Sequence, residues 1–124
     1  AALGLHYYTA GLERWVRRIG VDAAKDLFLT ARTVTGEELL RMGWLTQLTD
    51  REGLDAAVDA LADRLAANAP VAVAGMKRVL NEISRGALDP VAADAMHEAS
   101  LSSEDIAEGV TAWKERRKPR FTGR

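Results

Sequence analysis

Apolar residues recur at helical spacing along almost all of this chain, and this period restricts the fold more than any other feature. One stretch places its large apolar side chains at positions i, i+3, i+4 and i+7: Leu12, Trp15, Val16 and Ile19. A longer stripe of the same period follows: Leu54, Ala57, Val58, Leu61, Ala62 and Leu65. Because a helix has 3.6 residues per turn, each set shares one helix face. The pattern predicts a mainly α fold of about seven helices, many of them short, with at most one short strand.

Glycine, proline and capping residues divide this pattern into separate helices. We expect helices over residues 12–19, 21–29, 35–43, 54–67, 70–84, 90–101 and 104–117. Thr35 and Glu38 form a capping box, and Ser102 or Ser103 caps the last helix. The expected stops are Gly20, Gly43, Asn68-Ala69-Pro70, Gly86 and Lys118-Pro119. Residues 44–48 alternate between apolar and polar, which suits a short strand or an extended segment, and we expect the tail 120–124 to be extended.

Composition excludes several classes of site. The chain has 124 residues, 17 of them basic and 18 acidic, so no overall field favours nucleic acid or an anionic membrane. It has no cysteine, which excludes disulfides and cysteine-based sites and is compatible with a cytoplasmic location. His6 is expected in a loop and His97 on a helix surface, and the two lack the spacing of metal ligands. The length suits one domain or a piece of one.

No self-sufficient catalytic motif is present, since the chain lacks G-x-S-x-G, a Walker loop and G-x-G-x-x-G. One basic cluster lies near the end: Lys114, Arg116, Arg117, Lys118 and Arg120. It suits phosphate binding, or a solvated helix end that complements the helix dipole. Tyr7 and Tyr8 suit a binding wall or simple packing. Three tryptophans lie on apolar stripes and are expected in the core or an interface: Trp15, Trp44 and Trp113.

The start of the chain is unusual. Residues 1–5 form an apolar run that is too short for a secretory signal or a membrane span. There is no initiator methionine and no charged lead-in. We therefore expect either a processed start or a chain cut from a longer protein.

The segment SSEDIAEGVTAWKERRKPRFTGR, residues 102–124, resembles the end of the enoyl-CoA hydratase/isomerase (crotonase) family. The motifs that match are Ser103-Glu104-Asp105, Glu108-Gly109, Trp113 (usually Phe in relatives), Arg116-Arg117-Lys118 and the run from Pro119 to Gly123. Further passages, residues 3–20, 27–48 and 67–82, are similar to family passages in the same order. The resemblance therefore covers essentially the whole chain.

This resemblance implies the C-terminal portion of an α/β crotonase (ClpP-like spiral) fold. Residues 1–50 would be the end of the core, with an active-site turn and the helices after it. Residues 51–124 would be a helical region for oligomerisation and CoA contact. The oxyanion-hole amides, the adenine-binding loop and the two glutamates of hydratases would lie in a missing N-terminal half, so we expect this piece alone to be catalytically inactive.

The resemblance also implies roles for particular residues. Gly11 matches the last glycine of a turn that faces the acyl group, and we expect it to close that turn, although Ala10 replaces the glycine before it. Tyr7 falls on a tyrosine of the methylmalonyl-CoA decarboxylase branch, with His6 in place of proline. A phenol there would orient a substrate carboxylate, so Tyr7 is the candidate catalytic residue; the alternative is that it only shapes the pocket.

The resemblance implies four further substrate contacts: Tyr8, Gly11, Leu101 and Arg116. Tyr8 and Gly11 would lie beside the acyl group. Leu101 matches an aromatic position of the CoA pocket, and Arg116 matches a basic residue that reaches the CoA phosphates.

The function implied is that of an acyl-CoA-processing enzyme, hydratase or isomerase in the broad sense and decarboxylase-like in the narrower one. It implies an acyl-CoA thioester as substrate, no cofactor other than the substrate's own CoA, and a homotrimer or hexamer. Composition alone would equally permit a non-enzymatic helical interaction module. Helices that evolved to cover a sheet are expected to expose an apolar face when the sheet is absent.

Overall fold

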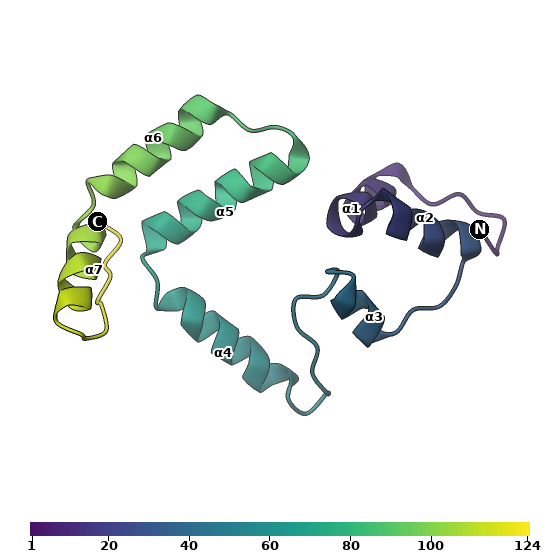
Figure 1. Cartoon of the computed structure of the whole chain (residues 1–124), viewed down its shortest axis with the longest axis horizontal. Coiled ribbons are helices and arrows are strands. Elements are labelled where there is room, and N and C mark those ends of the chain that lie inside the picture. Colours follow the sequence, from purple (N-terminus) through teal and green to yellow (C-terminus); the bar gives the residue numbers. More distant parts are fainter. The chain divides into compact units, whose positions relative to one another are not determined.

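The computed structural model describes residues 1–124, and every regular element in it is an α-helix (Figure 1). The helices are α1 (Thr9–Ile19), α2 (Val21–Thr30), α3 (Gly36–Arg41), α4 (Leu54–Ala66), α5 (Pro70–Arg85), α6 (Pro90–Leu101) and α7 (Glu104–Lys114). This confirms the predicted mainly α fold of about seven helices. The chain divides into two compact units, Ala1–Glu52 and Gly53–Arg124, which are described separately.

In the first unit, α1 and α2 meet at a single residue and pack against each other. Gly20 ends α1 and begins α2 with a φ of 81°, a left-handed value that favours glycine. Leu27 is buried in this pair. Trp15 of α1 contacts Phe28 of α2 edge to face, with ring centroids 5.7 Å apart. It also stacks on Trp44 at 3.6 Å. This unit is therefore held largely by aromatic side chains.

The start of α3 forms the predicted capping box. The Glu38 N–H donates to the Thr35 hydroxyl at 3.3 Å, and the Thr35 N–H donates to the Glu38 carboxylate at 3.2 Å. Arg32 then joins α2 to α3 through ion pairs with Asp26 at 2.7 Å and with Glu38 at 3.0 Å. Hydrogen bonding to the Thr35 backbone, followed by that to Arg32, lowers the pKa of Glu38. The carboxylate therefore both caps the helix and holds the preceding loop.

The segment after α3 contains no strand, so the strand alternative for residues 44–48 is wrong. The N–H groups of Trp44 and Leu45 both donate to the Leu39 carbonyl, at 2.9 and 3.2 Å. A strand requires a neighbouring strand that pairs with these groups. Here these N–H groups donate to a carbonyl of α3 instead, so the segment forms no regular structure.

In the second unit, α5 and α6 pack as neighbours and each begins with a proline in its first turn. Ser103, one of the two predicted caps of α7, accepts a hydrogen bond from the Ile106 N–H at 3.3 Å. Asp89 was not among the predicted caps, yet its side chain accepts a hydrogen bond from the Ala92 N–H at 3.1 Å at the start of α6. These caps account for where the helices of this unit begin.

The apolar stripes of α4 and α5 lie open. Six of their large side chains are between 43 and 65% exposed: Val58, Leu61, Leu65, Met76, Leu80 and Ile83. Trp113 is 80% exposed, so it is not a core residue, whereas Trp15 and Trp44 pack on each other. The second unit therefore does expose an apolar face, as expected for helices that cover another layer.

Helix α7 ends at Lys114, three residues earlier than predicted. Arg116 takes a left-handed conformation with a φ of 54°, which terminates the helix before Lys118-Pro119. The tail beyond it is non-helical, as expected, and returns along α7 (Figure 1, yellow). The Arg124 carbonyl accepts from the Glu104 N–H at 2.7 Å, at the opposite end of the helix.

Candidate functional site

The first candidate region is the turn before α1, where two tyrosines lie over a glycine. The rings of Tyr7 and Tyr8 are 4.7 Å apart, and that of Tyr7 lies 4.9 Å from Phe28. Gly11 is buried beneath them. A Cβ at Gly11 would lie 2.8 Å from the ring of Tyr8 and closer still to that of Tyr7. Only glycine therefore leaves room for both rings.

The structure changes the expected place of Gly11. It was predicted to close the turn, but α1 begins at Thr9, so Gly11 lies within the first helical turn. Tyr8 is the N-cap, with extended backbone, and no side chain caps this helix end. The glycine is needed for the close approach of the rings rather than for an unusual backbone conformation.

The two tyrosines remain accessible. Tyr7 is 39% and Tyr8 58% exposed, and neither hydroxyl hydrogen-bonds within the chain. His6 is exposed in the loop before them, as predicted. A ring that is fixed on one face while its hydroxyl is free can donate a hydrogen bond to a bound ligand. The predicted residues Tyr7, Tyr8 and Gly11 thus form one cluster.

The second candidate region is the basic segment 114–120 after α7, and its arginines are not equivalent. The guanidinium of Arg117 binds Glu108 through two parallel contacts of 2.6 and 2.8 Å. Its Nε donates to Glu115 at 2.6 Å, and Nη1 also donates to the Lys118 carbonyl at 3.2 Å. Arg117 is therefore engaged within the chain, whereas Lys114, Arg116 and Lys118 form no ion pair.

Glu108 is the centre of this segment. Its carboxylate accepts hydrogen bonds from both terminal nitrogens of Arg117, and it also accepts one from the Arg120 N–H at 2.7 Å. The hydrogen bonds from Arg117 and then from the Arg120 backbone lower the pKa of Glu108 to about 2. The carboxylate thus stays charged at any physiological pH and neutralises Arg117. The other cations of the segment, Lys114, Arg116 and Lys118, are exposed and form no ion pair.

Leu101, predicted to line the CoA pocket, is the last residue of α6 and is 48% exposed. Arg116 lies beyond the end of α7, beside the exposed Trp113 in a shallow hollow that Lys114 also lines. Tyr7, Tyr8 and Gly11 belong to Ala1–Glu52, and Leu101 and Arg116 belong to Gly53–Arg124. The predicted residues therefore form groups on two separate units.

Sequence reasoning missed the role of Asp105. This carboxylate is 3% exposed and accepts the N–H groups of Thr122 at 2.7 Å and Gly123 at 2.9 Å. It thereby holds the tail against the start of α7. The available signal was the matching Ser103-Glu104-Asp105 motif, but nothing in the sequence pairs it with residues so far along the chain.

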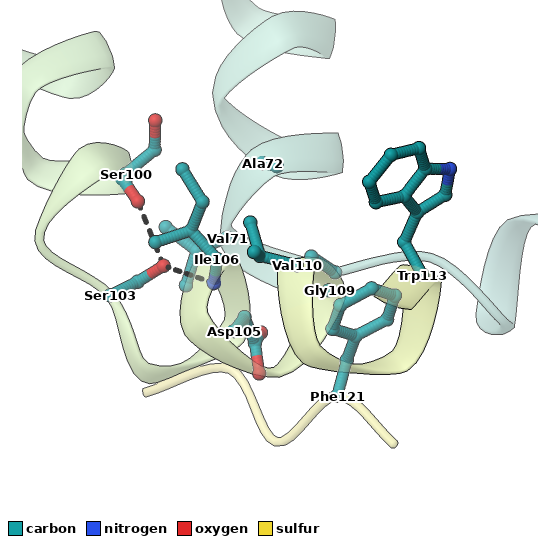
Figure 2. Close-up of a pocket in the computed structure, with 11 residues that line it drawn as sticks. Val71, Ala72, Ser100, Ser103, Asp105, Ile106, Gly109, Val110, Trp113 and Phe121 are labelled. Carbon is teal, nitrogen blue, oxygen red and sulfur yellow. Dashed lines mark hydrogen bonds between the residues drawn. The ribbon is translucent and has the colours of Figure 1, made fainter. Parts of the chain in front are cut away.

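An apolar groove of about 400 Å³ lies between α5, α6, α7 and the tail (Figure 2). Figure 2 shows Val71 of α5, Val110 of α7 and Phe121 of the tail along its walls. Phe121 covers Gly109, where a Cβ would lie 3.6 Å from its ring. Asp105 at the groove's edge places Phe121 by fixing the next two residues. The groove is thus a surface formed partly by the returning tail.

No helix combines the length and the apolarity needed to cross a membrane. No three His, Asp or Glu side chains gather closely enough to hold a metal ion.

Comparison with known proteins agrees with the resemblance. The chain is 33% identical to a methylmalonyl-CoA decarboxylase of Escherichia coli K12 over 98% of its own length and 48% of the relative's. It is 31% identical to a short-chain-enoyl-CoA hydratase of Clostridium acetobutylicum, over 94% of the chain and 45% of that enzyme. The chain thus spans about half the length of these relatives.

Solved structures give the same result. An enoyl-CoA hydratase from Mycobacterium tuberculosis H37Rv matches with a TM-score of 0.82 and 35% identity, over 99% of this chain and 50% of that one. An all-helical chain that matches half of such an enzyme is a portion of the crotonase fold. The family model for enoyl-CoA hydratase/isomerase matches residues 1–124. The chain therefore belongs to the enoyl-CoA hydratase/isomerase family.

Proposed function

We propose that this chain is the C-terminal part of an acyl-CoA-processing enzyme, to which it contributes an acyl-pocket wall, CoA contacts and a subunit interface. The observation that carries this proposal is the tyrosine cluster over Gly11, an accessible aromatic wall with free hydroxyls. The family match and the free cations of the basic segment support it. The reaction needs no cofactor in this proposal, because CoA arrives with the substrate.

The first part of the proposal concerns Tyr7 and the acyl group. Phe28 supports one face of the Tyr7 ring, and its hydroxyl is free to donate to a substrate oxygen. Tyr8 forms the adjoining wall, and Gly11 admits both rings. A phenol held in this way would bind a substrate carboxylate and orient it for the loss of CO₂. The match to a methylmalonyl-CoA decarboxylase supports decarboxylation as the narrower alternative to hydration or isomerisation.

The second part concerns CoA. Arg116 is proposed to bind its phosphates, since Arg117 is already engaged by Glu108 and Glu115. A guanidinium suits phosphate because it presents paired donors. Leu101 is proposed to contact the CoA moiety through its exposed aliphatic side chain.

The third part concerns assembly. The exposed stripes of α4 and α5 are proposed to cover other parts of a homotrimer or hexamer. A cytoplasmic location is also part of the proposal, and the absence of cysteine is compatible with it. Sedimentation of the full chain is expected to show association, and a compact monomer without exposed apolar surface would contradict this part.

The reaction is tested by assaying the full-length enzyme, of which this chain is proposed to be the C-terminal part, on crotonyl-CoA and on methylmalonyl-CoA. Hydration of crotonyl-CoA supports a hydratase or isomerase, and release of CO₂ from methylmalonyl-CoA supports a decarboxylase. Tyr7→Phe is expected to reduce decarboxylation about tenfold or more, the effect of losing one hydrogen bond to a charged group. Unchanged decarboxylation in a variant that is folded by circular dichroism would show that Tyr7 only shapes the pocket. An inactive full-length enzyme with no affinity for CoA would overturn the whole proposal.

A further inference from the structure

Three helices of this chain, α3, α5 and α7, end with the same hydrogen-bond pattern. One residue takes a left-handed conformation and donates its N–H to the carbonyl three positions back, and the next residue donates to the carbonyl five positions back. At the end of α3, Gly43 donates to Leu40 and Trp44 to Leu39. At the end of α5, Gly86 donates to Ile83 and Ala87 to Glu82. At the end of α7, Arg116 donates to Trp113 and Arg117 to Ala112.

The left-handed residue differs at one of the three ends. It is Gly43 with a φ of 80° and Gly86 with a φ of 66°, but Arg116 with a φ of 54°. A Cβ disfavours this conformation, which is why glycine is the usual residue there. An arginine in this position is a strained choice that other contacts must maintain, and such strain is found at functional positions.

The contacts that maintain it converge on Glu108. Its two carboxylate oxygens bind both terminal nitrogens of Arg117, at 2.6 and 2.8 Å, and one of them also accepts the Arg120 N–H at 2.7 Å. The residues on both sides of Arg116 are fixed as well, because Glu115 accepts from the Arg117 Nε at 2.6 Å. The segment 115–120 is thus closed around the carboxylate of Glu108, about two turns back along α7.

The same contacts determine which cationic side chains of the segment can bind a phosphate. Arg117 uses Nε, Nη1 and Nη2 within the chain, so it cannot also bind a phosphate bidentately. Lys114, Arg116 and Lys118 flank it and form no ion pair. If Glu108 did not hold Arg117, the segment would lose the contacts that oppose relaxation of Arg116.

We propose that Glu108, acting through Arg117, is the positioning residue that holds Arg116 in its left-handed conformation and presents it to the phosphates of CoA. This inference rests on the proposed function, since it takes Arg116 as the phosphate ligand. Glu108 itself does not touch the substrate. Its role is to restrict the segment before CoA binds, so that less ordering is needed on binding.

The test measures affinity for coenzyme A by isothermal titration and for pantetheine, which lacks the phosphates, by NMR titration, both with the full-length enzyme that contains this chain. Glu108→Gln is expected to weaken coenzyme A binding about tenfold, the effect of losing one charge-assisted contact, and to leave pantetheine binding unchanged. The matched control is Glu13→Gln, which removes the carboxylate of an exposed ion pair with Arg17 on α1. It is expected to change neither affinity.

Arg116→Gly distinguishes positioning from a merely structural role. Glycine suits the left-handed conformation, so the melting temperature is expected to stay the same or rise while coenzyme A affinity falls at least tenfold. In the Arg116→Gly background, Glu108→Gln is expected to cause no further loss. Additive losses, or an equal loss of pantetheine affinity, would overturn the inference.

A second variant covers the case in which Glu108→Gln does not fold. Arg117→Lys keeps the charge but loses the paired donors. It is expected to weaken coenzyme A binding when Arg116 is present and to have no effect when it is combined with Arg116→Gly. Undiminished coenzyme A affinity in Arg116→Gly would overturn both the assignment of Arg116 and this inference. A loss in Arg116→Gly with none in Glu108→Gln and Arg117→Lys would overturn this inference alone.

Discussion

The tyrosine cluster and the basic segment are built in opposite ways. In Ala1–Glu52, Tyr7 and Tyr8 are placed by ring packing over a missing Cβ at Gly11. In Gly53–Arg124, the segment after α7 is placed by two carboxylates, Asp105 and Glu108, that accept backbone and guanidinium N–H groups. The difference teaches that one region depends on shape and the other on charge. The first should respond to added volume, and the second to lost charge and to pH.

The largest effect is expected from removing the buried carboxylate. Asp105→Ala leaves the N–H groups of Thr122 and Gly123 without their charged acceptor. Two charge-assisted hydrogen bonds are lost, so we expect a loss of about 2–3 kcal/mol in unfolding free energy and release of the tail. Thermal melting and amide exchange at Thr122 and Gly123 measure this.

Its matched control is Asp59→Asn on the exposed side of α4, which is expected to lie within about 0.5 kcal/mol of the parent. If Asp105→Ala melted like this control and kept its tail amides protected, charge would not be what holds the tail.

The next effect tests shape in the first unit. Gly11→Ala places a methyl group against both tyrosine rings, so one ring must move. We expect a loss of about 1–2 kcal/mol from overpacking and altered tyrosine ring signals by NMR. Gly75→Ala is the matched change in α5, where a Cβ would meet nothing nearer than Met96 at 4.0 Å. It is expected to stabilise the helix by about 0.5–1 kcal/mol, because alanine favours a helix more than glycine does. Equal shifts in both variants would contradict the packing argument.

The smallest effect is the response to acid. The folded pKa of Glu108 is about 2, below the ordinary value of 4.5 for glutamate. Because the folded pKa is lowered, ionised Glu108 stabilises the folded segment in full at pH values above the ordinary pKa of 4.5. This stabilisation is lost as the pH falls from 4.5 to about 2. Because the pair is exposed, the contribution is small and is weakened further by salt.

NMR signals of the Arg120 amide should therefore move over this pH range, whereas those of the Tyr7 ring should stay constant. Movement of both signals together would show general acid unfolding instead. Glu108→Gln is expected to abolish the Arg120 response, which provides the control.

The sequence predicted local structure far better than partnerships between distant residues. The capping box of Thr35 and Glu38 and the stop at Gly86 were predictable because their partners lie within one helical turn. The end of α7 was not, since helical spacing continues past Lys114 and the left-handed Arg116 carries no glycine signal. The assigned roles of Tyr7, Tyr8, Leu101 and Arg116 came from resemblance and stay predictions.

By itself, the sequence determined the helical class, the approximate helix borders and the family, because these depend on periodicity, capping and residue order. Only the tertiary structure decided which charges are free. Arg117 and Arg116 are adjacent and look alike in the sequence, yet one binds Glu108 and the other has no ion-pair partner. Asp105 likewise became a buried anchor only when the tail returned to it. Such roles depend on where a chain folds back, and residues that are far apart in sequence carry no local pattern that records it.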